Sequence, residues 1–239
     1  MARSIPDLPA IVAPSQAEPK TKGDAMRVRR VVTGQEADGR SVVVQDEQVE
    51  PVTVALFPGA EFHRIWGDDA RPALPSDGTP LSAPSHFPPA EGYRFGMFTM
   101  APAHAGDLEA HAGNRQDLDR KRPGQIRQGL DGPPAQDLDP PAQDLDPDDR
   151  LAEIQDKLPG LIDVLEPDGA GMHRTDTIDF NLIVSGEVWL ELDDGAEVLL
   201  KAGDCVVQNG ARHRWRNPSS DPCVMAVAQI GAARRSSTD

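Results

Sequence analysis

The stretch GMHRTDTIDFNLIVSGEVWLELDDGAEVLLKAGDCVVQNGARHRWRNPSSDPCVMAVA, residues 171–228, decides the fold class. Within it, residues 187–192 alternate between apolar and other side chains, as a strand with one buried face does. Asp193-Asp194-Gly195 predicts a hairpin turn, and Gly186 and Gly210 predict further turns. Short strands at close, even spacing, with turns between them, are typical of a β-sandwich or β-barrel.

Upstream of this stretch, short β-branched and aromatic runs predict more antiparallel strands. Gly and Pro separate these runs, which lie at 41–45, 52–57, 62–66 and 93–100. We therefore assign residues 26–104 to the N-terminal strands of the same barrel.

Two other segments lack this pattern. Residues 1–25 are rich in Pro, Ala, Ser and Lys and predict a disordered tail, so Met26 is an alternative start of the natural chain. Residues 105–150 carry few large apolar side chains and repeat the sequence PPAQDLD at 133–139 and 140–146. Such a segment predicts a disordered, acidic, Pro-rich insertion. It is either an expanded neutral repeat, which we favour, or a docking segment.

Residues 151–235 are expected to hold a helix and then the core of the barrel. The helix is predicted because Leu151, Ile154 and Leu158 fall on one helical face, after an Asp pair that can cap it.

Composition excludes several classes of partner. The chain has 239 residues and a formal net charge of −15, which argues against binding to nucleic acid. No apolar run approaches the roughly 18 residues that span a bilayer, and the N-terminus lacks a secretory signal. The two cysteines, Cys205 and Cys223, are interpreted as reduced core thiols. These features together predict a cytoplasmic protein.

Two groups of residues resemble the paired motifs of the cupins. Residues 172–179 read MHRTDTID, and Gly210, His213 and Asn217 follow with the spacing G-x2-H-x3-N. The sequence is similar in particular to single-domain cupins of secondary-metabolite pathways, whose core reads M-H-x-T-D-T-I-D. The resemblance implies an all-β fold, the cupin double-stranded β-helix or jelly-roll barrel, with a few short helices.

The resemblance also implies a metal site. It places the ligand positions of the first motif at His173, Thr175 and Asp179, and that of the second motif at His213. A threonine stands where histidine is usual, and an aspartate where glutamate is usual. The implied site is one divalent ion (Fe, Mn, Ni, Co or Zn) held by His173, Asp179 and His213, with open positions for substrate. Asp176 is a second-ranked ligand, because strand parity turns it outward.

Other residues are weaker candidates. In the alternative to a metal site, His173 and His213 only form hydrogen bonds inside a metal-free barrel. We assign no role to His86, His104 and His111. The candidates for the wall of a substrate pocket are Thr175, Gln208, Trp215 and His63.

The function implied by the resemblance is an enzyme acting on a small organic acid, carbonyl or enol by decarboxylation, dehydration or isomerisation. An Fe(II) dioxygenase and a non-catalytic small-molecule-binding cupin are the alternatives, and a protein-interaction role for the acidic repeat is a third. The expected partners are a small-molecule substrate and a second copy of the chain, paired through sheet edges in a homodimer.

Overall fold

The computed structural model describes residues 26–79, 83–103, 146–167 and 171–235. The predicted tail and most of the predicted insertion, residues 105–145, lie outside these ranges. Within the described ranges, none of the helices has the length and apolar character needed to cross a bilayer.

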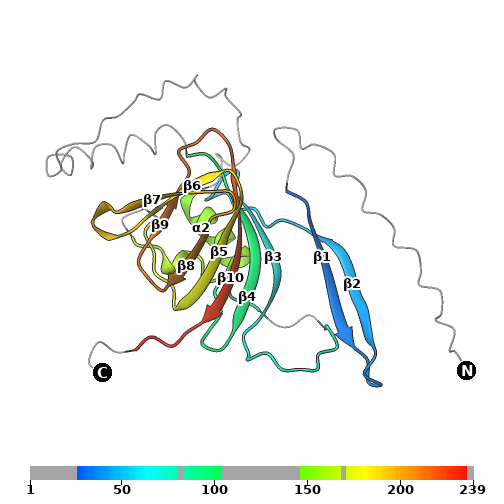
Figure 1. Ribbon diagram of the computed structural model, residues 1–239. Helices are drawn as coiled ribbons and strands as arrows, with labels where there is room; N and C mark the ends of the chain where they lie inside the picture. The colour runs from blue at the N-terminus through cyan, green and yellow to red at the C-terminus, as the bar shows by residue number, and fades with distance from the viewer. Residues whose placement is uncertain (1–25, 80–82, 104–145, 168–170, 236–239) are drawn as a thin grey trace, which may run out of the picture.

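Two antiparallel sheets form the barrel (Figure 1). The first sheet has five strands in the order β3-β4-β10-β5-β8, and the second has three in the order β7-β6-β9. Their bounds are β3 Glu61–Asp68, β4 Tyr93–Met100, β5 Thr177–Ser185, β6 Glu187–Glu191, β7 Glu197–Lys201, β8 Cys205–Asn209, β9 Arg214–Arg216 and β10 Cys223–Gly231. The one-turn helix η3, Asp193–Gly195, lies between β6 and β7, where the sequence predicts a hairpin turn.

A core between the two sheets holds the barrel together. Ile183 of β5 and Met225 of β10 pack against Val188 and Leu190 of β6 and Leu200 of β7, and all five are buried. Burial of each such side chain contributes roughly 1.5–3 kcal/mol. The all-β jelly-roll fold expected from the sequence is therefore confirmed.

The cysteines differ from the expectation. Cys223 is fully buried in this core, whereas Cys205 is exposed, and both thiols are free. Cys205 is the register partner of Leu182, which also faces solvent. The prediction of two core thiols is thus wrong for Cys205, because β8 turns that side chain to the outer face of the sheet.

The N-terminal hairpin is a sheet of its own. Strands β1 (Val28–Gln35) and β2 (Ser41–Val49) pair only with each other, and Figure 1 shows them projecting beside the barrel. The base of the hairpin packs on the outer face of the five-stranded sheet, where Met26 and Val28 contact Val224 and the partly buried Met97. Of the segment assigned to N-terminal barrel strands, β3 and β4 join the five-stranded sheet.

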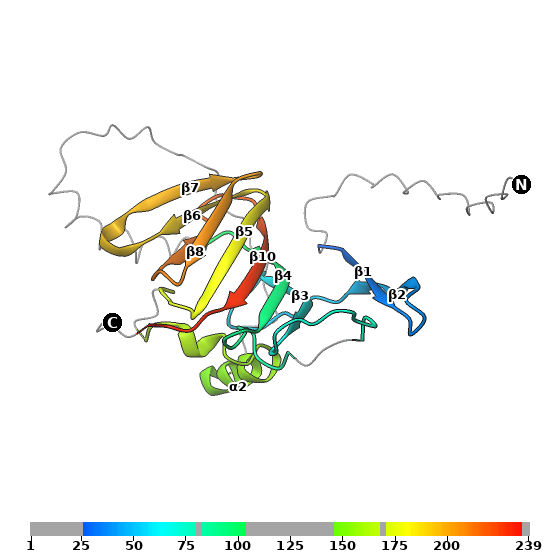
Figure 2. The ribbon, with the colours of Figure 1, turned by 60° about the horizontal axis from the view of Figure 1, so that its bottom comes forward.

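Helix α2 (Pro147–Lys157) lies at one end of the barrel (Figure 2). Its N-cap is Asp146, whose carboxylate accepts a hydrogen bond from the backbone of Asp148 at 3.0 Å. Ile154 and Leu158 are 0% exposed, whereas Leu151 is 43% exposed and does not join the buried face. The short helix η2 (Ile162–Val164) follows.

Residues 52–57 do not form the strand that the sequence predicts. Val52 alone bridges to Phe62, and the residues after it turn toward α2. Val54 is buried against Ile154 and Leu158. Its β-branched side chain therefore packs against the helix, and this segment does not continue as a strand.

Candidate functional site

The barrel contains a cavity of about 820 Å³. Four polar side chains lie in one row across the inner face of the five-stranded sheet, because their strands are in register: Arg94, Gln229, Asp179 and Gln208. The first three line the cavity, and Gln208 ends the row beyond its wall. Another part of the wall is aromatic and includes Phe57, Phe62, Phe98 and Trp215.

His173 and His213 lie next to each other at this cavity, with their ring planes tilted at 51°. Their backbones form a bridge with two hydrogen bonds of 2.9 Å, and their ring centroids are 4.2 Å apart. Trp215, two residues along, packs edge-on against His213 with centroids 5.6 Å apart. The structure thus brings together two histidines that are 40 residues apart in the sequence.

Hydrogen bonds to the backbone fix the orientation of both imidazoles. Nδ1 of His173 lies 3.1 Å from the carbonyl of Gly171, and Nδ1 of His213 lies 2.8 Å from the carbonyl of Ala211. A carbonyl only accepts, so each Nδ1 donates, and the lone pair of a neutral ring is on Nε2. Burial lowers the pKa of His173, and it lowers the pKa of His213 to about 4 with a further contribution from the charge of His173. Both rings are therefore neutral at pH 7.

Asp179 is the buried carboxylate of the site. Gln229 donates a long hydrogen bond of 3.4 Å to Oδ2, while Oδ1 is buried and has no partner among the described residues. Burial raises the pKa of Asp179 above its ordinary value, against smaller opposite effects of hydrogen bonding and of His173. An unpaired buried carboxylate oxygen is costly, so a ligand atom at Oδ1 would be favourable.

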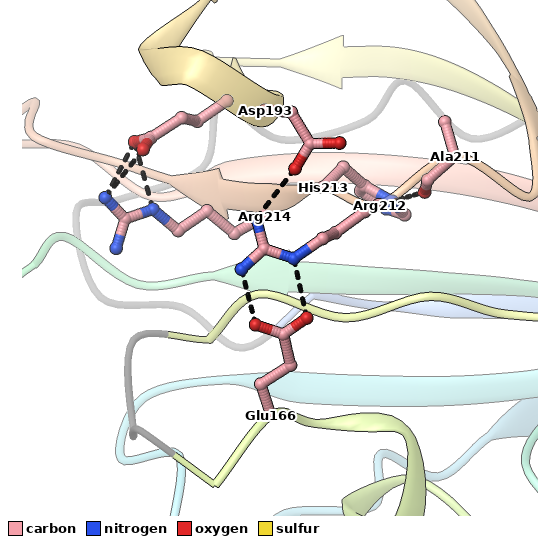
Figure 3. A network of polar contacts seen from close by, with 7 residues as sticks. Glu166, Asp193, Ala211, Arg212, His213 and Arg214 are labelled. Atoms are coloured by element: carbon pink, nitrogen blue, oxygen red, sulfur yellow. Dashed lines mark hydrogen bonds and ion pairs between the residues drawn. The ribbon is translucent and has the colours of Figure 1, made fainter.

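Two ion-paired arginines flank His213 (Figure 3). Arg212 donates from Nε to Glu166 at 2.6 Å, adds a second bond from a terminal nitrogen to the same carboxylate, and reaches Asp193 at 2.8 Å. Arg214 binds Glu191 at 2.8–2.9 Å. The backbone N–H of Glu166 donates to the carbonyl of Met172 at 2.9 Å. The Arg212–Glu166 pair therefore ties the segment before His173 to the segment that carries His213.

The weaker candidates from the sequence have different places. Trp215 lines the cavity, as expected, whereas Thr175 is buried behind the wall with its hydroxyl 2.8 Å from that of Thr177. His63 is part of the wall at the edge strand β3 and is 1% exposed. Its register partner Met97 packs against the N-terminal hairpin, so the ring lies on the hairpin side of β3 and not beside Asp179.

The alternative ligand Asp176 points away from the cavity. Its carboxylate is exposed and accepts a hydrogen bond of 2.6 Å from Arg234. This is the outward direction that strand parity predicts.

The donor set fits a divalent metal only in part. Both histidines present Nε2 with Nδ1 bound to a carbonyl, which is the usual second hydrogen bond of a metal-binding histidine. Yet in the described part of the chain, no three His, Cys, Asp or Glu side chains are close enough together to hold a metal ion. The Nε2 atoms of the two histidines therefore fit a metal ion as they stand. The buried Oδ1 of Asp179 could serve as the third donor only after a side-chain rotation brings it closer to them.

The cavity residues that were missed in the sequence include Arg64, His86, Arg94, Asn181 and Gln229. His86 was assigned no role because it lies in a Pro-rich loop, but the structure places it on the cavity wall. Gln229 continues the inward-facing parity of β10 after Val227, and a polar residue in that position was the available signal. His104 and His111 lie outside the described residues.

Residues 162–228 match the family described as "Cupin domain". The chain contains a cupin domain. Its curated relatives include oryzines biosynthesis cluster protein J of Aspergillus oryzae, 51% identical over 55 residues, which are 23% of this chain and 31% of that protein. Phomopsin biosynthesis cluster protein D of Diaporthe leptostromiformis is 43% identical over 67 residues, 26% of this chain and 35% of that protein. The cupin chain thus spans about a third of the length of these two relatives.

A third relative is the cupin-domain-containing oxidoreductase virC of Hypocrea virens, 37% identical over 46 residues, 19% of this chain and 24% of that protein. Among solved structures, the Schizosaccharomyces pombe Cnp3 cupin domain has a TM-score of 0.37 at 8% identity, covering 85% of this chain and 87% of that chain. A cupin 2 conserved barrel domain protein from Salinispora arenicola has a TM-score of 0.33 at 13% identity, covering 79% and 92%.

Proposed function

We propose that this cupin is a metal-dependent enzyme that acts on a small organic acid, carbonyl or enol inside the barrel. One observation carries the proposal: two neutral imidazoles, with ring centroids 4.2 Å apart, both keep Nε2 available on a cavity wall that also holds a buried carboxylate whose Oδ1 has no partner among the described residues. Such an arrangement leaves three donor atoms unused in a cavity large enough for a small substrate.

In this proposal His173 and His213 supply two nitrogens and Asp179 supplies one oxygen to a single divalent ion, Fe, Mn, Ni, Co or Zn. A metal bound there would act as a Lewis acid on a carboxylate, carbonyl or enol oxygen. Gln229 holds the second oxygen of Asp179, and Trp215 covers the imidazole of His213, so that water is excluded from one side of the site. These roles suit decarboxylation, dehydration or isomerisation, which need no net redox change.

A second candidate is an oxidoreductase, including an Fe(II) dioxygenase. It is favoured by the names of relatives such as virC and the cupin-domain-containing oxidoreductase srdB of Neurospora crassa. Two nitrogens and one carboxylate with open positions are also the donor set of non-haem Fe(II) oxygenases. The identity of the bound metal bears on the Fe(II) dioxygenase, because a metal other than iron would count against it, whereas iron fits both candidates.

Elemental analysis of protein purified without a metal-affinity tag tests the proposal. We expect close to one equivalent of a divalent metal in the parent chain, and its loss in His173→Ala and His213→Ala. A metal-free chain whose melting temperature does not respond to any of the five ions would defeat the proposal and leave a non-catalytic binding barrel.

Two aspartate variants provide the matched control. Asp179→Asn removes the buried third donor, whereas Asp176→Asn changes an exposed carboxylate that binds Arg234. We expect metal affinity to fall on the order of 10-fold to 100-fold in the first and to stay unchanged in the second. Equal losses in both would contradict the assignment of Asp179.

A further inference from the structure

Arg64 is a cation on the cavity wall that the proposed metal site does not use. It lies on β3 in register with Gly96 of β4, and it shares the inner face of the sheet with Phe62, which stacks on Phe98. Gly96 has no side chain, and both it and Arg64 line the cavity.

The hydrogen bonding of Arg64 contrasts with that of its neighbour Arg94. Arg94 donates to the carbonyls of Ser85, Asp68 and Tyr93 and forms an ion pair with Asp69. Arg64 donates to a single carbonyl, that of Ala83, and no carboxylate among the described residues forms an ion pair with it. A guanidinium has five N–H donors, so most of those on Arg64 remain available in a partly buried position.

A second donor lies beside Arg64. Nδ1 of His86 is buried and has no partner among the described residues, and it donates an N–H in the tautomer that carries the proton there. The charges of Arg64 and Arg94, added to burial, lower the pKa of His86 to about 4, so the ring is neutral at pH 7. A positive potential with free N–H donors is an environment that favours a carboxylate, whose two oxygens match the planar fork of a guanidinium.

The wall next to these donors is apolar. The ring of Phe62 stacks on Phe98 at 6.3 Å and meets Phe57 at 6.4 Å, and His86 contacts Phe62 edge-on at 5.9 Å. Arg64 is on β3 and Asp179 is on β5, and β4 and β10 lie between these two strands. At the usual spacing of neighbouring strands, the backbones of β3 and β5 are about 14 Å apart. A ligand that reaches from one end to the other therefore needs an extended apolar body.

We propose that the cavity binds an organic acid with its carboxylate at Arg64, its apolar chain along Phe62 and Phe98, and its other end beside Asp179 and His213. The inference rests on the proposed function for the reacting end of the substrate, while the contact with the carboxylate can be tested without any metal.

The test compares octanoate with 1-octanol, which share a chain and differ in charge, by calorimetric titration of the metal-free full chain at pH 7.5. We expect octanoate to bind at least tenfold more tightly. Arg64→Gln should weaken octanoate on the order of 10-fold to 100-fold and leave 1-octanol within threefold, as for loss of a charge-assisted hydrogen bond. Arg64→Lys keeps the charge but not the fork, so it should retain part of the preference.

Arg40→Gln is the control, because Arg40 is an exposed arginine in the turn of the hairpin and pairs with Glu36. Circular dichroism and the melting temperature establish that each variant is folded. If Arg64→Gln fails to fold, Arg64→Lys alone decides: octanoate must lose affinity while 1-octanol does not. Equal affinity for both probes, no binding of either at millimolar concentration, or octanoate binding indifferent to Arg64 would overturn the inference.

Metal content is measured on the chain as purified, before any metal is removed for the titrations. A chain that is purified without metal and is not stabilised by divalent ions, but that still prefers octanoate through Arg64, would defeat the proposed function and leave the carboxylate site standing. A chain that is purified with metal but shows no preference for the acid would overturn the carboxylate site and leave the proposed function standing.

Discussion

Asp179 is a buried carboxylate on β5, where Phe180, Leu182 and Val184 face solvent. On β5, Thr177, Asp179 and Asn181 point into the barrel, while Phe180 and Leu182 point out of it. Buried polar groups are normally hydrogen-bonded, so a strand that turns its polar residues inward must meet partners there. The reversal is what the proposed binding site requires of this part of the barrel, and the apolar core lies further along the strand at Ile183.

His86 leads to a prediction about pH. Its pKa is about 4 in the folded chain, against 6.5 for an unperturbed imidazole, because of burial and then the charges of Arg64 and Arg94. Above pH 6.5 the ring is neutral in both states and pH has no effect. Between pH 6.5 and 4 only the unfolded chain binds the proton, so the free energy of unfolding falls as pH falls, by up to about 3 kcal/mol.

His86→Phe keeps an aromatic ring against Phe62 and Phe87 but cannot be protonated. We expect urea denaturation at pH 7 and pH 4.5 to show a smaller loss of stability in this variant than in the parent. Parallel losses in the two proteins would mean that His86 is protonated in the folded chain.

The sequence predicted part of the candidate site. The cupin-like spacing located His173, Asp179 and His213, and the structure puts all three on the cavity wall. It could not locate Arg64 or His86, because their contacts come from packing between distant segments: His86 stands in a loop whose backbone is bound to Pro159 at 2.7 Å. Such pairings between loops leave no periodic signal in a single sequence.

At the scale of structural elements, the Arg212–Glu166 pair is a positioning contact for both histidines. It joins the segment that leads to His173 with the segment that carries His213 (Figure 3). Contacts that orient metal-binding histidines typically affect metal affinity 10-fold to 100-fold when removed. We therefore expect Arg212→Gln to lower metal affinity by about tenfold, measured by competition with a chelator, with little change in melting temperature.

Arg234→Gln is the matched control, since Arg234 also bridges to an exposed carboxylate, that of Asp176, but does not contact either histidine. Hydrogen exchange adds a second readout: the amide of His173, bonded to the carbonyl of His213, should exchange faster in Arg212→Gln. Unchanged affinity and exchange would show that the β-bridge alone holds the two rings.

Helix α2 gives a prediction about stability. Ile154 is fully buried against Val54, whereas Leu151 is 43% exposed on the same helix. Ile154→Ala should lower the free energy of unfolding by about 2–5 kcal/mol, through lost burial and the cavity that it leaves. Leu151→Ala should cost less than about 1 kcal/mol, because the side chain is largely in water already. Urea denaturation of the two variants measures the difference, and similar costs would contradict the packing of α2.

The helix and the strands show what a sequence pattern can predict about elements. The apolar spacing located α2, but it grouped Leu151 with Ile154 and Leu158, since a spacing cannot tell how wide the covered stripe is. Likewise the run 52–57 has the composition of a strand, yet Val54 packs against Ile154 of α2 and does not pair in a sheet. Tertiary packing decides such cases and overrides local propensity.

At the scale of the whole molecule, part of the outer face of the five-stranded sheet, beyond the area that the hairpin covers, is apolar and exposed. One row across it is Phe95, Ala228, Phe180 and Val207, which the strand register places side by side. Phe95, Phe180 and Val207 are 43%, 48% and 54% exposed. A contiguous exposed apolar patch is a feature of interaction surfaces. The expected homodimer would therefore use this face, through sheet-on-sheet packing, and not the sheet edges that the sequence suggested.

We expect the parent chain to be a dimer at micromolar concentration and Phe180→Asp to be a monomer with an unchanged circular dichroism spectrum. In a two-fold symmetric dimer each copy presents the same row, so one substitution places two carboxylates in the interface. Val31→Asp is the control, because Val31 is 49% exposed on the separate hairpin. Sedimentation velocity distinguishes the species. A monomeric parent chain would show that this face does not pair two copies. A dimer that survives Phe180→Asp but dissociates in Val31→Asp would place the interface on the hairpin.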